Sequence, residues 1–373
     1  MAKHTITFYP LGNADTTLIK LDNGQVILWD FANKCDPADE NDKRCDLPAE
    51  LDKSVKGDYN VVCFTHADED HICGFSDYFY LDHAKKYQHE ERKKIKELWV
   101  PAAVLVDESL EKEAKILKAE ARHRLKNKKD IRIFSRPKKM KDWCDEQDDI
   151  SYEDVKHLFV DAGKFAPGFS KDDEGVQFFV HAPFVSETKN INRNDEAIVV
   201  QATFNDKCET KIILGSDNTH EAWKDIVNVT KLKKNEEYLE WDLFHVSHHC
   251  SYTAIGPEKG DDRTEPTEEV KWLFEDQGNN RCRIISPSWE IPIKGSEQDN
   301  DQPPHRQAAK FYKDLVKVKQ GEFKVTMEEP NKSRPEPIIF EIEHSECLKH
   351  KISKAGAATF STSTKTPRAG CDD

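Results

Sequence analysis

With 373 residues, the chain is long enough for one large domain or two ordinary ones. Only 37% of its residues are hydrophobic and 34% are charged, and no apolar run approaches the roughly 20 residues that a bilayer span needs. The composition therefore excludes a protein built on membrane-spanning helices. The N-terminus lacks the apolar core and cleavage site of a signal peptide, so we expect a cytoplasmic protein that does not bind membranes.

Charge is distributed unevenly along the chain. The net charge of −14 repels nucleic acid and anionic lipid on average, yet residues 111–141 hold thirteen Lys or Arg against four Asp or Glu. This basic stretch is a candidate footprint for phosphate groups, and a solvated helix face is the alternative interpretation. The 10 cysteines include no Cys-x-x-Cys pair, which favours reduced thiols over a zinc or disulfide framework.

In chain order, the first predicted elements are strands. β-Branched runs predict strands at 5–8, 16–21 and 26–31, and Asp22-Asn23-Gly24 predicts a hairpin between the last two. Later strands are predicted at 59–65, 98–100, 176–182, 197–204, 211–214, 243–246, 283–286 and 338–342. Spaced apolar residues predict helices at 83–96, 110–129, 220–227, 268–275 and 305–316.

Strands that come in clusters with helices between them favour two sheets sandwiched by helices over a strictly alternating parallel sheet. We therefore expect an α+β fold with one domain over residues 1–345. Residues 82–150 are expected to form a charged helical insertion in it. The last residues, 346–373, become rich in Ser, Thr, Gly, Ala and Lys, which predicts a disordered tail.

The segment His66-Ala67-Asp68-Glu69-Asp70-His71 follows the apolar strand predicted at 59–65. Imidazole nitrogen and carboxylate oxygen suit zinc, manganese or iron, and four candidate ligands within six residues exceed what one open catalytic ion needs. Two adjacent metal ions are therefore predicted. The alternative is a polar helix N-terminus in which Asp68 and Asp70 cap amide groups and the histidines are incidental.

Other predicted strands end in the same kind of residue. Asp217 follows the strand at 211–214 and His248-His249 follow the strand at 243–246, while His181 lies at the end of a third strand. Four separate strands thus deliver metal-capable side chains at their C-terminal ends, which favours a metal centre. For His181, an ordinary buried histidine remains an equal alternative.

Together these segments resemble the metallo-β-lactamase fold, and within it the soluble hydrolase domain of ComEC-type DNA-uptake proteins. The similar segments are His-x-Asp-x-Asp-His at 66–71, Gly-Ser-Asp at 215–217 and Val-Ser-His-His at 246–249. The opening Leu-Gly-Asn-Ala-Asp at 11–15 is similar to that group's Gly-x-Gly-Asp turn, and His305 lies in a segment like its Gly-His-Pro. The resemblance covers roughly residues 5–315 and implies a four-layer αββα sandwich.

The resemblance also implies site residues and cofactors. Two divalent ions, zinc or manganese, are expected. Their implied ligands are His66, Asp68 and His181 for one ion, Asp70, His71 and His248 for the other, and Asp217 as the bridge. Asp70 is expected to orient the attacking hydroxide, and His249 to contact substrate. Further expected substrate contacts are Ser247, Ser251, His305, Arg132 and Arg136.

Three departures qualify this assignment. Asp68 stands where the wider superfamily usually has a second His, Cys73 and Cys250 stand at positions normally held by Gly, and Asn13 replaces another Gly.

The resemblance implies phosphodiester hydrolysis of nucleic acid or nucleotides by a free-standing enzyme, for example in defence. A hydrolase of a thioester, lactone or amide is the first alternative. A catalytically impaired module that binds a protein partner through its charged insertion is the second.

Overall fold

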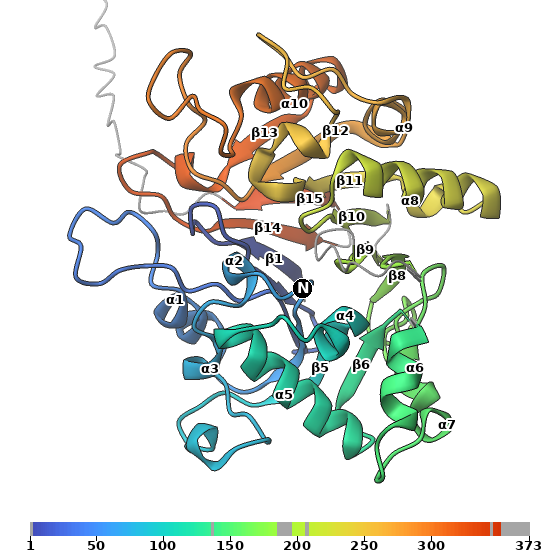
Figure 1. Cartoon of the computed structure of the whole chain (residues 1–373). Helices are drawn as coiled ribbons and strands as arrows, with labels where there is room; N and C mark the ends of the chain where they lie inside the picture. Colours follow the sequence, from blue (N-terminus) through green and yellow to red (C-terminus); the bar gives the residue numbers. More distant parts are fainter. Residues whose placement is uncertain (1–2, 136–137, 185–195, 206–208, 344–345, 352–373) are drawn as a thin grey trace, which may run out of the picture.

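The computed structural model describes residues 3–135, 138–184, 196–205, 209–343 and 346–351. Two β-sheets lie face to face and helices cover both outer surfaces, so that the chain forms four layers (Figure 1). Residues 4–160 and two strands within 338–351 build one sheet with its helices, and residues 176–325 build the other. The αββα sandwich expected from the sequence is confirmed.

The first sheet has nine strands in the order β15-β14-β1-β2-β3-β4-β5-β6-β7. It is antiparallel from β15 to β3 and parallel from β3 to β7. Its strands are β1 (His4–Phe8), β2 (Thr17–Lys20), β3 (Val26–Trp29), β4 (Tyr59–Cys63), β5 (Ile95–Pro101), β6 (Ile131–Phe134), β7 (Phe159–Val160), β14 (Ile338–Glu343) and β15 (Glu346–Lys351).

The second sheet has six strands in the order β13-β12-β11-β10-β9-β8. The pairs β8–β9 and β9–β10 are antiparallel, whereas the pairs β10–β11, β11–β12 and β12–β13 are parallel. The strands are β8 (Val176–Ala182), β9 (Val199–Phe204), β10 (Thr210–Leu214), β11 (Trp241–His245), β12 (Gly278–Ser286) and β13 (Glu322–Val325).

Helices cover the outer face of each sheet (Figure 1). On the first sheet these are α1 (Leu47–Ser54), α2 (Glu69–Ile72), α3 (Phe75–Tyr78), α4 (Ala102–Val106), α5 (Lys112–Lys126), α6 (Lys138–Asp145) and α7 (Tyr152–Val155). On the second sheet they are α8 (His220–Lys233), α9 (Glu268–Lys271) and α10 (Arg306–Lys319).

Three hydrophobic cores separate the four layers, because successive side chains of a strand point to opposite faces. In β4, Val61 and Cys63 pack between the sheets, whereas Val62 packs toward α1–α7. In the second sheet, Ile212 joins the central core and Ile213 packs toward α8–α10. Both sheets are therefore apolar on two faces, and polar side chains collect at the strand ends.

Most predicted elements are confirmed, but the helix predicted at 83–96 is wrong. Only the short 3-10 turn η1 (Lys85–Tyr87) forms there, and β5 begins at Ile95. The Tyr80 N–H donates to the Lys93 carbonyl, and Arg92 donates to the carbonyls of Ser76 and Phe79. These contacts with the preceding segment outweigh local helix propensity. The helix predicted at 268–275 is α9 followed by a π-helical turn over Trp272–Asp276.

The expected charged insertion is part of the sheet architecture. Residues 82–150 contribute β5 and β6 to the parallel half of the first sheet, and α4, α5 and α6 pack on that sheet. The tail expected over 346–373 begins instead with β15, which pairs with β14, and residues 352–373 lie outside the described residues. Within the described parts of the chain, no helix combines the length and apolarity needed to cross a membrane.

Candidate metal centre

The candidate site lies where the two sheets meet at the C-terminal ends of β4, β10 and β11. The β4 strand leads into His66 and then into α2, which carries His71. Asp217 follows β10, and His249 follows β11. Asp15, in the loop between β1 and β2, completes a buried group with His71, Asp217 and His249 in which one ligand atom of each lies within 4.8 Å of the others.

His71 is oriented by a buried carboxylate. Its Nδ1 donates to Asp30 Oδ2 over 2.8 Å, and Asp30 also accepts from the backbone N–H and hydroxyl of Thr65. Because Nδ1 carries the donated proton, Nε2 is left to face the cluster. His71 Nε2 lies 3.4 Å from Asp217 Oδ1 and 3.7 Å from Asp15 Oδ2.

His66 is oriented through Thr65 in the same way. The Thr65 hydroxyl donates to Asp30, so its oxygen accepts from the Ser216 hydroxyl at 2.9 Å and from His66 Nδ1 at 3.1 Å. The Nε2 atom of His66 therefore carries no proton and keeps its lone pair, and it lies 3.8 Å from Asp68 Oδ2. One hydrogen-bond network, centred on Asp30, thus sets the ring orientation of both histidines.

An unusual turn after β11 brings His249 into the cluster. His248, His249 and Cys250 all have positive φ, at 51°, 49° and 67°, a conformation that costs free energy for residues other than glycine. His249 Nδ1 donates to the Pro287 carbonyl at 2.8 Å, and its Nε2 lies 3.0 Å from Asp70 Oδ2 and 3.7 Å from Asp217 Oδ2. His248 points elsewhere: its Nδ1 lies 3.4 Å from the Thr253 hydroxyl.

Several polar atoms of the cluster are buried without a hydrogen-bond partner. They are both carboxylate oxygens of Asp15 and the Nε2 atoms of His66, His71 and His245. His245 ends β11, and its Nε2 lies 3.0 Å from Asp15 Oδ1 without hydrogen-bond geometry. Unpartnered buried polar atoms are costly, and here they are the preferred ligand types of zinc and manganese. The residues therefore fit a divalent metal centre.

The electrostatics of the cluster agree with this fit. Burial by itself lowers the pKa of His249, but Asp217 and Asp70 outweigh it and raise the pKa to about 9. Burial also opposes the charge on His71, yet nearby carboxylates raise its pKa well above the ordinary value. Burial raises the pKa of Asp217, but His249 and His71 outweigh it and hold the pKa well below the usual range. The negative charge of the buried carboxylates thus favours a positive charge beside them, and a cation bound by the histidine Nε2 atoms can provide it.

Asp68 directly precedes α2, and Asp70 lies in the first turn of this helix. Asp68 is the N-cap residue, but its side chain makes no capping hydrogen bond, so the helix N-terminus does not account for it. The Asp70 side chain is 28% exposed, compared with 5% for Asp217 and 4% for Asp15. Asp70 and Asp68, whose side chain is 35% exposed, are therefore the carboxylates beside the centre that solvent or substrate reaches most easily.

Several residues predicted for the site lie elsewhere. His181 is buried on the outer side of its strand, where its Nε2 donates to the Tyr238 carbonyl at 2.7 Å and burial lowers its pKa to about 4. Ser247 is buried and bonded to the Gly215 carbonyl and to Trp223, so it packs under α8. The expected metal ligand His181 and the expected substrate contact Ser247 are both corrected by these contacts.

The remaining predicted contacts also have structural partners. Ser251 is buried and accepts from the Thr253 N–H at the start of a short 3-10 turn. His305 is buried beside Tyr252, whose N–H it accepts through Nδ1. Arg132 Nε lies 3.4 Å from Glu97 and its guanidinium donates to the His157 carbonyl. Arg136 lies outside the described residues.

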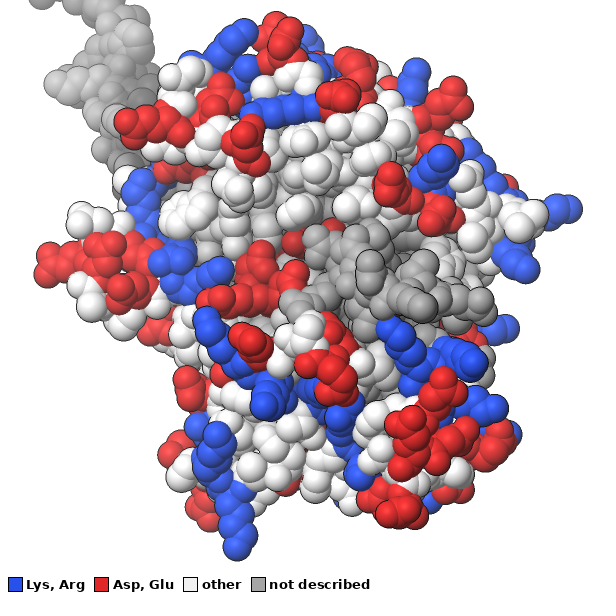
Figure 2. All heavy atoms as spheres, in the orientation of Figure 1, with Lys and Arg blue, Asp and Glu red and all other residues white. Residues whose placement is uncertain are grey.

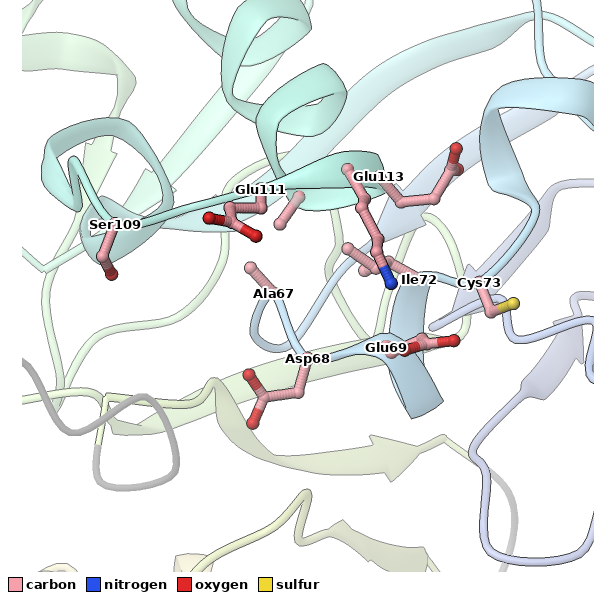
Figure 3. Close-up of a pocket in the computed structure, with 10 residues that line it drawn as sticks. Ala67, Asp68, Glu69, Ile72, Cys73, Ser109, Glu111 and Glu113 are labelled. Carbon is pink, nitrogen blue, oxygen red and sulfur yellow. The ribbon is translucent and has the colours of Figure 1, made fainter.

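A pocket of about 270 Å³ lies beside the centre, between α2 and the start of α5 (Figure 3). Asp68, Glu69 and Cys73 line one wall, and Ser109, Glu111 and Glu113 line the other. Glu113 is bonded to the N–H and hydroxyl of Ser76, and the other carboxylates outnumber the cation of the lining, Lys112, so that the pocket is acidic. Cys250, at the other Cys-for-Gly position, is buried in the outer core and is not a sulfur ligand.

The basic stretch 111–141 is largely neutralised within the fold. Many of its described cations form ion pairs: Lys118 and Arg122 with Glu108, Arg124 with Glu120, Lys126 with Asp149, Lys128 with Asp154, Lys129 with Asp130, and Arg132 with Glu97. Figure 2 shows basic and acidic side chains interspersed on the visible face. A continuous basic surface, as long nucleic acids require, is not visible there.

Sequence reasoning missed Asp15, Asp30 and His245. Asp30 lies near the end of the strand predicted at 26–31, and Asp15 directly precedes the strand predicted at 16–21. His245 is the last residue of β11, three positions before the His-His pair. Position at the end of a strand could therefore have indicated Asp30 and His245, whereas Asp15 stands at the start of one.

Three solved structures illustrate what the chain is similar to. The metallo-β-lactamase fold protein YhfI from Bacillus subtilis is 10% identical, with a TM-score of 0.40, over 86% of this chain and 96% of that one. Zn²⁺-bound PqqB from Methylobacterium extorquens is 8% identical, with a TM-score of 0.37, over 89% and 99%. A long form of RNase Z from yeast is 13% identical, with a TM-score of 0.34, over 85% and 44%. No protein-family model and no curated protein sequence matches the chain.

Proposed function

We propose that the chain is a metal-dependent hydrolase that cleaves phosphodiester bonds in nucleotides or nucleic acid. The proposal is carried by one observation, a buried cluster of three oriented imidazoles and two carboxylates. The imidazoles are those of His66, His71 and His249, and the carboxylates are those of Asp15 and Asp217. The five side chains come from both sheets and leave several buried polar atoms unpartnered. A cluster of this kind costs free energy unless a cation binds.

The donor set fits two divalent ions, zinc or manganese. Asp15, His71, Asp217 and His249 would hold one ion, and His66 with Asp68 would contribute to the second. When bound, such ions bring the pKa of a coordinated water toward neutrality and offset charge that develops on a phosphoryl oxygen. Asp30 and the Pro287 carbonyl fix the histidine rings in the required tautomers.

Asp70 is the residue best placed to handle the attacking water. Burial alone would raise its pKa, but the hydrogen bond with His249 and the charge of His71 lower it, so the carboxylate remains ionised at neutral pH. An ionised and partly exposed carboxylate accepts a hydrogen bond from water and holds its oxygen toward the substrate. No serine or cysteine nucleophile is required.

A second candidate function is hydrolysis of an uncharged carboxylic acid derivative: a thioester, a lactone or an amide. The acidic pocket in Figure 3 favours this candidate, because Asp68, Glu69 and Glu111 disfavour a polyanion close to the centre. The same chemistry would serve, since the electrophile is then a carbonyl carbon in place of phosphorus.

The experiment measures metal content and activity on one preparation purified without chelator. We expect about two zinc or manganese ions per chain by elemental analysis, and hydrolysis of bis(p-nitrophenyl) phosphate. His71→Ala and Asp70→Ala should each reduce this activity to about one hundredth or less. The matched controls are His89→Ala and Asp77→Ala, both on exposed side chains, and these should retain it.

Each outcome points to a different candidate. Turnover of a thioester without turnover of the phosphodiester would replace the leading proposal with the second candidate. A preparation that takes up neither zinc nor manganese would favour the third possibility raised by the sequence, a catalytically impaired module that binds a protein partner.

A further inference from the structure

A second pocket lies at the far end of α8 from the candidate metal centre. Its volume of about 340 Å³ exceeds the 270 Å³ of the pocket in Figure 3. Residues 162–164, β8 and the C-terminal turn of α8 contribute its walls. The helix starts three residues after Asp217 and, with 14 residues, is about 21 Å long (Figure 1). The pocket is therefore separate from the centre.

The charge of this pocket is positive. None of its described lining residues is acidic, whereas Lys164 and Lys233 come from two different walls. Neither lysine forms an ion pair within the described part of the chain. The end of α8 adds little opposing charge, because the N–H groups of Lys234 and Asn235 donate to the Thr230 carbonyl. Two uncompensated cations at one cavity attract an anion.

Apolar side chains lie beside the two cations. Phe179, Phe184 and Val229 line the pocket, and Val229 is 37% exposed. Phe165, next to Lys164 in the chain, is 41% exposed and packs edge-on against Phe179. Two of the exposed large hydrophobic side chains thus gather at one cavity, as at sites that bind an apolar group.

His181 gives the pocket a buried polar contact. The side chain lines the cavity but is almost fully buried, and its Nε2 donates to the Tyr238 carbonyl. Nδ1 is left as an acceptor, and it has no hydrogen-bond partner among the residues that the structure describes. Burial lowers the pKa of His181 to about 4, so the ring is neutral at pH 7. This acceptor can receive an N–H or O–H group of a ligand.

We propose that this pocket is a binding site for a small organic anion with an apolar body. Lys164 and Lys233 hold its anionic group, and Phe179, Phe184 and Val229 contact the apolar part. A volume of about 340 Å³ suits a small molecule and is too small for a protein domain. Because the site lies apart from the metal centre, it does not depend on the proposed function.

The test uses two related fluorescent dyes with the full-length chain. 1-Anilinonaphthalene-8-sulfonate combines aromatic rings with an anionic group, and N-phenyl-1-naphthylamine lacks the sulfonate. Wild type should bind about one sulfonated dye per chain and prefer it to the neutral dye. In the double variant Lys164→Met, Lys233→Met, the affinity for the sulfonated dye should fall roughly 5- to 30-fold, the loss of two exposed charge contacts. Its affinity for the neutral dye should not change.

A further variant tests the apolar wall. Val229→Asp places a carboxylate in the cavity and should weaken the binding of both dyes. Val318→Asp makes the same change on α10, which packs on β12 and β13 at the opposite edge of the second sheet, and should bind as wild type does. Lys224→Met is the control for the lysines, because Lys224 is an exposed residue of α8 outside the pocket. Circular dichroism verifies that each variant folds.

Displacement of the sulfonated dye identifies the anionic group. Phenyl phosphate and benzoate present a phosphate and a carboxylate on the same ring, and two unpaired lysines should favour the phosphate, which carries more charge at pH 7. Stronger displacement by benzoate would assign the site to carboxylates. Phenol, which is uncharged at pH 7, should displace the dye least.

Three results would overturn the proposal. The first is equal displacement by phenyl phosphate, benzoate and phenol. The second is sulfonated-dye binding that the double lysine variant leaves unchanged. The third is dye binding that EDTA or His71→Ala abolishes, since the anion would then lie at the metal centre.

Discussion

Asp30 organises the candidate metal centre without belonging to the proposed group of ligands. It accepts hydrogen bonds from His71 Nδ1 and from both donors of Thr65, and Thr65 in turn orients His66. Asp30→Asn removes the charge and places an amide opposite the His71 N–H. We expect metal affinity to fall about 10- to 100-fold, because both rings lose their fixed tautomer.

A competition titration against a coloured zinc chelator measures this change. Asp77→Asn makes the same chemical change on an exposed residue of α3 and serves as the control. Equal affinities in Asp30→Asn and wild type would mean that the hydrogen bonds of Asp30 do not set the ligand geometry.

At the same scale, part of the centre was predictable from the sequence. His66, Asp70, His71 and Asp217 lie at strand ends, and they do meet in space. The choice between the adjacent histidines was not predictable. It depends on left-handed backbone at His248, which only the packed turn after β11 imposes.

At the scale of elements, a buried ionic network joins α5 to the segment that precedes β5. Glu120 accepts hydrogen bonds from Arg124, one turn later, and from the side chain and N–H of His83. Both the Glu120 and Arg124 side chains are almost fully buried. Glu120→Gln leaves the buried guanidinium with Asp82, 3.5 Å away and half exposed, as its remaining counter-charge, which should lower the free energy of unfolding by up to about 3–5 kcal/mol at pH 7.

This loss should depend on pH in a defined direction. Burial would raise the pKa of Glu120, but the His83 and Arg124 contacts lower it from its ordinary 4.5 to about 2. A lowered pKa in the folded state means that the stabilisation is complete above pH 4.5 and is lost as the pH falls toward 2. The difference between wild type and Glu120→Gln in urea unfolding should therefore be constant from pH 8 to 5 and shrink below that.

The control for this network is Glu153→Gln, which breaks an exposed i, i+3 pair with Lys156. Exposed pairs contribute little, so its unfolding should match that of wild type. A Glu120→Gln protein as stable as wild type at pH 7 would contradict the assigned network.

The same network explains why the helix predicted at 83–96 does not form. Its charged residues look like a solvated helix, but His83 and Arg92 are engaged by α5 and by the end of α3. Strands were predicted more reliably, because burial on both faces of each sheet gives them continuous apolar runs. The conformation of residues 83–96 depends on contacts with distant segments, and such contacts leave no periodic pattern in the sequence.

At the scale of the whole molecule, the proposed metal centre connects the two halves of the sandwich. Asp15, His66 and His71 come from the first sheet and its loops, whereas Asp217 and His249 follow strands of the second. A bound ion would therefore link the sheets directly, in addition to the apolar core between them. Metal binding should then stabilise the entire fold and not only the loops around the centre.

Chelation tests this link by thermal unfolding. At a free metal concentration one hundred times Kd, binding adds about 2.7 kcal/mol to the free energy of unfolding. Removing metal with EDTA should lower Tm by on the order of 5 °C in a chain of this length, and zinc or manganese should restore it. His71→Ala should unfold at the lower temperature with or without EDTA, whereas His89→Ala should respond as wild type does. A Tm that EDTA leaves unchanged in a preparation shown to lose its metal would mean that the centre does not hold the two sheets together.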